Sequence, residues 1–366
     1  MSLPSIFVLA RSVREPTSLL SLSVGEWDLL IRQGRNADLL GLIAAQCDAT
    51  GVLDLVPAGP KMHLVSALNM ALRQQIEVRR EVQHIHRALA AAKVPLVLLK
   101  GAAYVVAGLP AGRGRLVSDV DILVPQDSLN EVESALMIHG WQSDGHSDYD
   151  QRYYRKWMHE LPPMRHFKRG TSIDVHHAIL PLTARLRPSS NKLLQAARPI
   201  GSNPEVKVLA PVDMVLHSAT HLFHEGELQL GLRGLADLDR LLRDFGSSNG
   251  FWDCLVPRAV ELELSRPLFY ALRYARFLLS TPIPEAVLRS SAEAPGGRRN
   301  GLALAAMDAL FLRALRPAHV TCSDRWTPLA RSTLYLRGHW LRMPPLLLAR
   351  HLGHQAFVAL RPLPTE

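Results

Sequence analysis

The stretch RLVSDVDILVP, residues 115–125, places two aspartates, Asp119 and Asp121, inside an otherwise apolar and β-branched run. Successive side chains of a β-strand point to opposite faces, so both carboxylates would lie on one face, with Val120 and Ile122 on the other. Neighbouring carboxylates repel each other and raise each other's pKa, so the pair needs a cation, a shared proton or full exposure to water. The rest of the sequence favours a bound divalent cation.

Signals for further strands, turns and helices lie on both sides of this stretch. VPLVLLKG (residues 94–101) is a short apolar run that ends in glycine, which predicts a buried strand followed by a tight turn. AAYVVAGL (102–109) can begin a helix, and GRGR (112–115) predicts a loop. Residues 126–141 have the spacing of an amphipathic helix. A small α/β unit therefore surrounds the two aspartates.

A hairpin is predicted farther along the chain, over residues 161–180. Its turn would lie at Arg169 and Gly170, because glycine tolerates the backbone angles that tight turns require. The second strand of this hairpin would carry Asp174 and His176 on one face, two residues apart. A third carboxylate could in this way join the same sheet.

Helical patterns flank the α/β unit on both sides. Apolar residues recur at three- and four-residue spacing over residues 25–93, and almost everywhere after about residue 190 apart from a possible strand at 206–210. We therefore predict an α+β fold with a small mixed-sheet core. Its parts are an N-terminal helical segment (1–93), the α/β core (94–185) and a helical C-terminal domain (186–366).

Composition indicates a globular protein. The chain has 366 residues, of which 48% are hydrophobic and 20% are charged. Its three cysteines form no CxxC pair and leave an odd number, which argues against a disulfide framework or a thiolate zinc site and favours a reducing cytoplasm. We expect no signal peptide and no transmembrane segment, because the N-terminal apolar patch follows no basic region and no apolar run is long enough.

The net charge of +9 permits an anionic partner, but a general bias toward arginine would produce the same excess. From residue 301 onward eight arginines and three acids are interleaved with Trp326, Tyr335 and Trp340. This basic C-terminal region could contact RNA, an acidic peptide or a membrane surface. It could equally be the solvated face of ordinary helices.

The core segment resembles the nucleotidyltransferase superfamily with the DNA polymerase β-type fold. More narrowly, it is similar to a largely uncharacterised bacterial branch in which a Lys-Gly turn precedes paired aspartates and an acidic-x-His strand follows. The matching segments are LLKGAAY (98–104), RGRLVSDVDILV (113–124), HELPPM (159–164) and SIDVHH (172–177). The resemblance implies that the strand-borne aspartates form a catalytic metal centre.

Nucleotidyl transfer is an in-line displacement at phosphorus, in which two magnesium ions can stabilise both the attacking and the leaving oxygen. Such hard cations prefer oxygen ligands, and carboxylates on adjacent strands supply them. We therefore expect Asp119, Asp121 and Asp174 to be catalytic and to bind Mg²⁺ (or Mn²⁺). Asp174 could also take a proton from an acceptor hydroxyl group.

Nucleotide binding is expected at the Lys-Gly turn and in the basic loop before the aspartates. Gly101 would let the backbone approach a triphosphate closely, and the cationic side chains would neutralise phosphate charge. The turn departs from the Gly-Gly or Gly-Ser of the wider superfamily, because Ala102 supplies no hydroxyl group. The expected nucleotide-binding residues are Lys100, Gly101, Arg113, Arg115 and Ser118.

Four histidines have two possible roles each. His159 and His176 could support the site, or they could be hydrogen-bonded structural residues. His217 and His221 stand four residues apart in HSATHLFHE, a spacing that can hold zinc on one helical face. Because no third ligand is evident, helix packing is the alternative that we favour for this pair.

The function that follows is transfer of a nucleoside monophosphate from an NTP substrate to an acceptor, with release of pyrophosphate. The acceptor could be a small molecule, a protein or RNA, because a fold does not specify a substrate. The alternative is a non-catalytic nucleotide- or partner-binding protein, antitoxin-like or a sensor, that retains the fold.

Overall fold

The computed structural model describes residues 6–143, 157–201, 203–226, 228–297 and 301–344, and its fold is α+β, as the sequence predicts. Within these ranges, seven strands form one mixed sheet in the order β3-β4-β5-β2-β1-β7-β6. The strands are β1 (Leu96–Leu98), β2 (Asp119–Leu123), β3 (Trp141–Ser143), β4 (Met164–His166), β5 (Ser172–His176), β6 (Arg198–Ile200) and β7 (Asn203–Val208).

The predicted hairpin is present at β4 and β5. These strands are antiparallel, with Met164 opposite Ile173. Gly170 lies in the connecting turn with φ +67°, a left-handed angle that favours glycine. Strand β5 then continues the sheet on its other side by pairing in parallel with β2. The aspartate-bearing strands therefore lie next to each other in the middle of the sheet.

The sheet extends beyond residue 185. Strand β7 includes the short strand predicted near residue 206, and it pairs in parallel with β1, with Leu96 opposite Val206. Strand β6 lies antiparallel to β7 at the edge. The chain thus returns to the sheet before it enters the C-terminal helices.

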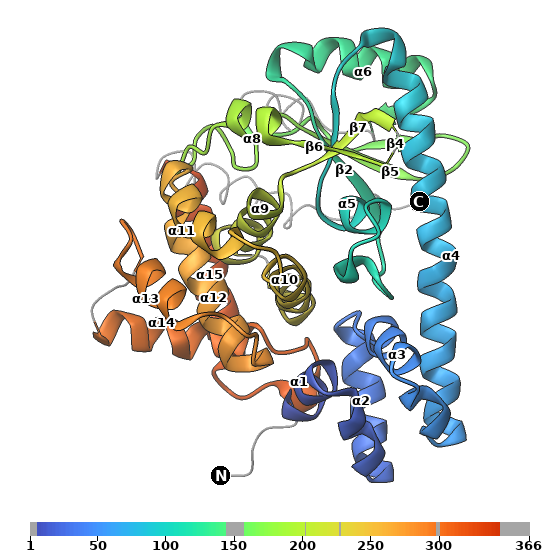
Figure 1. Cartoon of the computed structure of the whole chain (residues 1–366), viewed down its shortest axis with the longest axis vertical. Coiled ribbons are helices and arrows are strands. Elements are labelled where there is room, and N and C mark those ends of the chain that lie inside the picture. Colours follow the sequence, from blue (N-terminus) through green and yellow to red (C-terminus); the bar gives the residue numbers. More distant parts are fainter. Residues whose placement is uncertain (1–5, 144–156, 202, 227, 298–300, 345–366) are drawn as a thin grey trace, which may run out of the picture.

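The longer helices cover the sheet and extend far beyond it (Figure 1). Helices α5 and α6 lie on opposite sides of the sheet, and α9 and α10 lie on the side of α5. The helices are α1 (Ile6–Arg14), α2 (Val24–Asn36), α3 (Leu40–Ala49), α4 (Ala58–Leu89), α5 (Lys100–Val106), α6 (Leu129–Ile138), α8 (Ser190–Ala196), α9 (Pro211–His224), α10 (Gly231–Phe245), α11 (Phe251–Glu261), α12 (Ser265–Leu279), α13 (Glu285–Glu293), α14 (Gly301–Ala314) and α15 (Thr327–Arg342).

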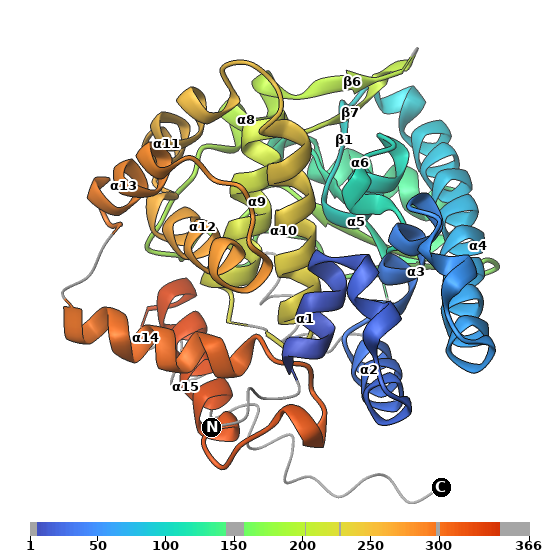
Figure 2. The same cartoon turned by 60° about the horizontal axis from the view of Figure 1, so that its bottom comes forward.

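One hydrophobic core connects the sheet with the helices on both sides of it in the sequence. Leu9 of α1, Val97 of β1, Leu235 of α10 and Leu334 of α15 all belong to it and are fully buried. Figure 2 shows α1 between the other N-terminal helices and the C-terminal helices. None of the helices in the described ranges combines the length and apolar character that a membrane crossing requires.

Candidate active site

The parallel pairing of β2 with β5 sets the predicted acidic residues side by side. Asp121 lies directly opposite Asp174, and Asp119 lies opposite Ser172. Residues opposite each other in neighbouring strands project to the same face, so all three aspartates share one face of the sheet. One carboxylate oxygen each from Asp121 and Asp174 and one ring nitrogen of His176 lie within 4.8 Å of one another. The structure therefore brings together the three aspartates that the sequence singles out.

Asp121 is the buried centre of this group, with 3% of its surface exposed. Its Oδ1 accepts hydrogen bonds from Lys100 Nζ at 2.8 Å and from His176 Nε2 at 3.0 Å. Burial opposes ionisation of Asp121, but Lys100 and His176 outweigh it and hold the pKa of this carboxyl well below its usual range. Asp121 is thus an ionised carboxylate with one cationic partner from the Lys-Gly turn.

Asp174 lies in a different electrostatic environment, although it is next to Asp121. Burial, followed by the charges of Asp121 and Glu160, raises the pKa of Asp174 to about 7. A divalent cation between the two carboxylates would reverse this effect, because an adjacent positive charge favours the ionised form. With the oxygen donors of Asp119 beside them, these residues fit a hard cation such as Mg²⁺ or Mn²⁺.

His176 connects Asp121 to a second acidic residue, Glu160. Its Nδ1 lies 3.2 Å from Glu160 Oε2, while its Nε2 faces Asp121. Burial opposes a charge on His176, but the hydrogen bond to Asp121 and the charge of Glu160 raise its pKa. The ring of His159 lies against it, with centroids 5.3 Å apart, and burial lowers the pKa of His159. His176 thus contacts Asp121 directly, whereas His159 packs behind it.

Lys100 is the first residue of α5, so the predicted tight turn is the start of this helix, and the side chain reaches Asp121 from there. Its backbone has a left-handed φ of +45°, and the preceding Leu99 donates its N–H to the Asp121 carbonyl at 2.9 Å. Burial disfavours the charge on Lys100, but Asp121 and then Glu225 raise its pKa. A permanently charged ammonium group is therefore fixed beside the carboxylates.

Gly101 makes room for the guanidinium group of Arg115. A Cβ atom at position 101 would collide with Arg115 Nη1. Arg115 Nε donates to Asp237 Oδ2 of α10 at 2.9 Å, and its guanidinium lies 5.7 Å from the ring centroid of Tyr104. Glycine at position 101 is thus explained by packing within the protein, in addition to the phosphate contact that the sequence suggests.

Gly101→Ala is therefore expected to lower the free energy of unfolding by about 1–3 kcal/mol, the usual cost of overpacking. The matched control is Gly25→Ala in α2, where a Cβ meets no atom within 4 Å and alanine favours the helix by up to about 1 kcal/mol. Chemical denaturation measures the free energy of unfolding of both variants. Equal stability of the two variants would show that Arg115 does not depend on the space at Gly101.

Of the two remaining residues predicted to bind the nucleotide, the structure places Ser118 at the site and Arg113 away from it. Ser118 Oγ donates to Asp119 Oδ1 at 3.0 Å, so Ser118 lies at the site. Arg113 is exposed and lines a different cavity with Gln46 and Arg240. The loop GRGR thus directs Arg115 toward the aspartates and Arg113 away from them.

A cavity of about 200 Å³ lies between the aspartates and the helices α9 and α10. His221 faces this cavity, while burial lowers the pKa of the neighbouring His217 to about 3. The possible three-residue metal groups found in the described ranges include neither histidine. The cavity is lined by Lys100, Gly101, Tyr104, Arg115, Leu116, Ser118, Asp119, Asp121, Ser218, His221, Leu222, Leu230, Arg233, Gly234 and Asp237.

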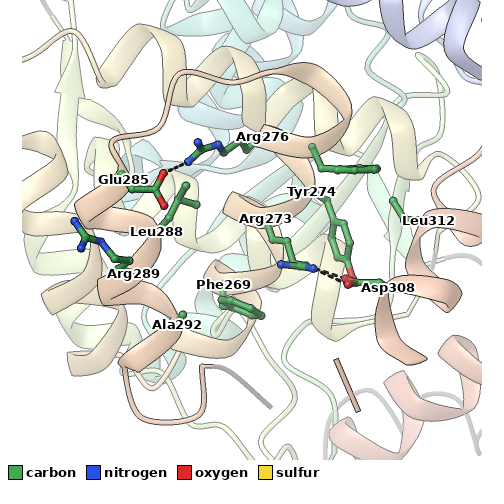
Figure 3. A pocket seen from close by; sticks show the side chains of 11 residues that line it. Phe269, Arg273, Tyr274, Arg276, Glu285, Leu288, Arg289, Ala292, Asp308 and Leu312 are labelled. Carbon is green, nitrogen blue, oxygen red and sulfur yellow. Dashed lines mark hydrogen bonds and ion pairs between the residues drawn. The ribbon is translucent and has the colours of Figure 1, made fainter. Parts of the chain in front are cut away.

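A larger cavity of about 610 Å³ lies elsewhere, among α12, α13 and α14 (Figure 3). Its walls carry two ion pairs, Arg273–Asp308 at 2.6 Å and Arg276–Glu285 at 2.6 Å, beside aromatic side chains. None of the predicted site residues lines it. Asp119 and Asp121 line the smaller cavity instead, so the candidate chemistry belongs there.

Residues 23–280 match a family described as uncharacterised nucleotidyltransferases. The chain belongs to this nucleotidyltransferase family. No curated protein sequence matches it significantly. The span that matches contains every predicted site residue and also α9 and α10, which form the opposite wall of the cavity.

The residues of this candidate site that the sequence interpretation misses include Glu160, Glu225 and Asp237. Glu160 directly follows His159 in HELPPM and pairs with His176 through an isolated β-bridge, which only the fold reveals. Glu225 ends HSATHLFHE four residues after His221, so helical periodicity could have indicated it. Asp237 lies 122 residues from Arg115, and no local pattern joins them.

Proposed function

We propose that this chain is a magnesium-dependent nucleotidyltransferase that moves a nucleoside monophosphate from an NTP to an acceptor, with release of pyrophosphate. The observation that carries the proposal is the pairing of Asp121 with Asp174 on adjacent parallel strands, with Asp119 on the same face. This arrangement suits a reaction in which negative charge develops on phosphoryl oxygens. Membership of the nucleotidyltransferase family supports it.

Asp119, Asp121 and Asp174 would hold Mg²⁺ or Mn²⁺, which when bound stabilises negative charge on the attacking and leaving oxygens. The chain's own cations would bind the triphosphate. Lys100 and Arg115 line the cavity, and so does Arg233, whose Nη1 also lies 3.0 Å from Asp38 Oδ2. Cationic side chains around the cavity would orient an NTP with its phosphates beside the carboxylates.

The test is pyrophosphate release from each NTP with Mg²⁺, measured with and without cell extract as a source of acceptor. In parallel, α-³²P-labelled NTP is followed into the components of the extract. We expect pyrophosphate release to depend on Mg²⁺ and label to appear in one class of component. Binding of Mg²⁺–NTP without pyrophosphate release or labelling would instead support the non-catalytic binding protein.

Lys100→Met should mainly weaken NTP binding. The substitution keeps the aliphatic volume but removes a charge-assisted contact to phosphate worth about 1.5–3 kcal/mol, so KM is expected to rise about 10- to 100-fold and by more than kcat falls. Lys93→Met is the matched control, because Lys93 is an exposed lysine with a similar left-handed φ of +52°. Steady-state kinetics with unchanged KM for Lys100→Met would remove Lys100 from the phosphate site.

A further inference from the structure

Helix α9 presents one polar face to the candidate active site. His217, His221 and Glu225 follow one another at four-residue intervals, so they lie along one side of the helix and its C-terminal end. His217 is buried, whereas His221 lines the same cavity as Asp119 and Asp121. The cavity therefore has carboxylates on the sheet wall and an imidazole on the wall formed by the C-terminal helices.

His221 is held in one orientation by Glu225. Its Nδ1 lies 2.7 Å from Glu225 Oε2, and the Glu225 side chain is only 13% exposed. Burial opposes ionisation of Glu225, but His221 and then Lys100 hold the pKa of this carboxyl below its usual range. An ionised carboxylate only accepts hydrogen bonds, so Nδ1 carries the proton that binds it.

When the ring of His221 is neutral, its other nitrogen is therefore the proton acceptor. With Nδ1 protonated, the neutral ring has its lone pair on Nε2. Within the described ranges no hydrogen bond to Nε2 is found, and the side chain is 44% exposed. A histidine whose Nδ1–H is fixed by a buried carboxylate and whose Nε2 is free has the arrangement of a general base.

We infer that the acceptor is a hydroxyl group and that His221 Nε2 takes its proton during transfer, with Glu225 as the positioning residue. The inference rests on the proposed nucleotidyltransferase function. The acceptor oxygen forms a bond to the α-phosphorus, and the bond from this phosphorus to the bridging oxygen breaks. Pyrophosphate leaves with that electron pair, and the acceptor proton passes to His221.

A phosphate acceptor fits this wall less well. A phosphate oxygen is already ionised near neutral pH, so it needs no base, and the Glu225 carboxylate behind His221 would repel it. A hydroxyl group needs to lose a proton as its oxygen attacks. Asp174 lies with Asp121 at the proposed cation site. A cation bound there would engage its carboxylate, whereas Nε2 of His221 would stay open to the acceptor.

Two measurements on the whole 366-residue chain test the inference. In the first, ¹⁵N-histidine NMR with and without Mg²⁺ and α,β-methylene-ATP follows His221, assigned with His221→Gln. We expect an Nδ1–H tautomer whose Nε2 signal shifts when the analogue binds, and loss of the tautomer preference in Glu225→Gln. An Nε2–H tautomer, or a bound analogue that leaves the His221 signals unchanged, would overturn this inference about His221. Neither result would contradict the proposed nucleotidyltransferase function.

The second measurement is transfer from α-³²P-ATP into extract. His221→Gln should keep the thermal shift with Mg²⁺–ATP but lose transfer about 10²- to 10⁴-fold, the usual contribution of a general base. Imidazole should restore activity to His221→Gly, and His139→Gln, an exposed histidine of another helix end, should match the wild type.

The bond that holds the label decides the acceptor class. A phosphodiester that resists pyrophosphatase supports a hydroxyl acceptor, whereas a pyrophosphate bond, or transfer by His221→Gln within about two-fold of wild type, would contradict the inference. Wild-type protein that neither binds Mg²⁺–ATP nor transfers label would reject the proposed function, and this inference with it.

Discussion

Asp121→Asn is expected to lower transfer on the order of 10³-fold, about 4 kcal/mol of transition-state stabilisation, and to abolish the rise in Tm that Mg²⁺–NTP causes in the wild type. The substitution removes the carboxylate at the centre of the site. It also leaves the charge of Lys100 without its ionised partner, since Asp121 Oδ1 lies 2.8 Å from Lys100 Nζ. We therefore expect an additional loss of about 2–3 kcal/mol in the free energy of unfolding.

Asp119→Asn is the matched control for this loss of stability. Asp119 is only partly buried, and the hydrogen bond described for it comes from the exposed Ser118. It should therefore reduce the thermal shift with Mg²⁺–NTP while changing stability by about 0.5 kcal/mol or less. Calorimetry with and without Mg²⁺–NTP distinguishes the two variants. An Asp121→Asn protein as stable as Asp119→Asn would show that the Lys100 pair contributes nothing to folding.

Asp174→Asn should also abolish most transfer, but it should make the protein without metal more stable. A carboxyl with a pKa of about 7 when folded, and about 4 when unfolded, binds its proton more tightly in the folded state. The wild type therefore loses stability as the pH rises from about 4 to about 7, and above that the penalty is constant. The variant lacks this penalty and should be about 2–4 kcal/mol more stable above pH 7.

Denaturation in EDTA across this pH range tests whether Asp174→Asn is more stable than the wild type. The difference between wild type and Asp174→Asn should be small near pH 4 and largest above pH 7. Asp48→Asn, at an exposed aspartate of α3, should show no comparable dependence. A variant that is less stable than the wild type at high pH would mean that Asp174 is not held among acidic neighbours, and its place at the cation site would have to be abandoned.

The strands of the site could be predicted because their signals are local. Alternation places Asp119 and Asp121 on one face, and the glycine at position 170 indicates the hairpin that carries Asp174. Burying the apolar face of each strand sets the face on which Asp174 lies, and this step needs only neighbouring residues. The parallel pairing that sets Asp174 opposite Asp121 joins distant segments and is seen only in the fold.

The electrostatics of the site could not be predicted in the same way. If only the repulsion between Asp119 and Asp121 is considered, replacing both would leave the free energy of unfolding unchanged or raise it. The ion pair of Asp121 with Lys100 reverses that expectation, and it depends on the position of the first residue of α5, 21 residues away. The partner of Arg115 is still more remote, in α10, so only the assembled fold shows that this arginine has a carboxylate at its side.

The parallel pairing of β7 with β1 limits where a recombinant fragment of this protein can end. A recombinant fragment ending at residue 185 would contain all three aspartates but would lack β7, so the backbone of β1 would become an unprotected edge. Such edges recruit strands from other molecules and lead to aggregation. The smallest autonomous unit must therefore include the returning strand, and a library of truncations or chimeras should place its junctions after residue 208.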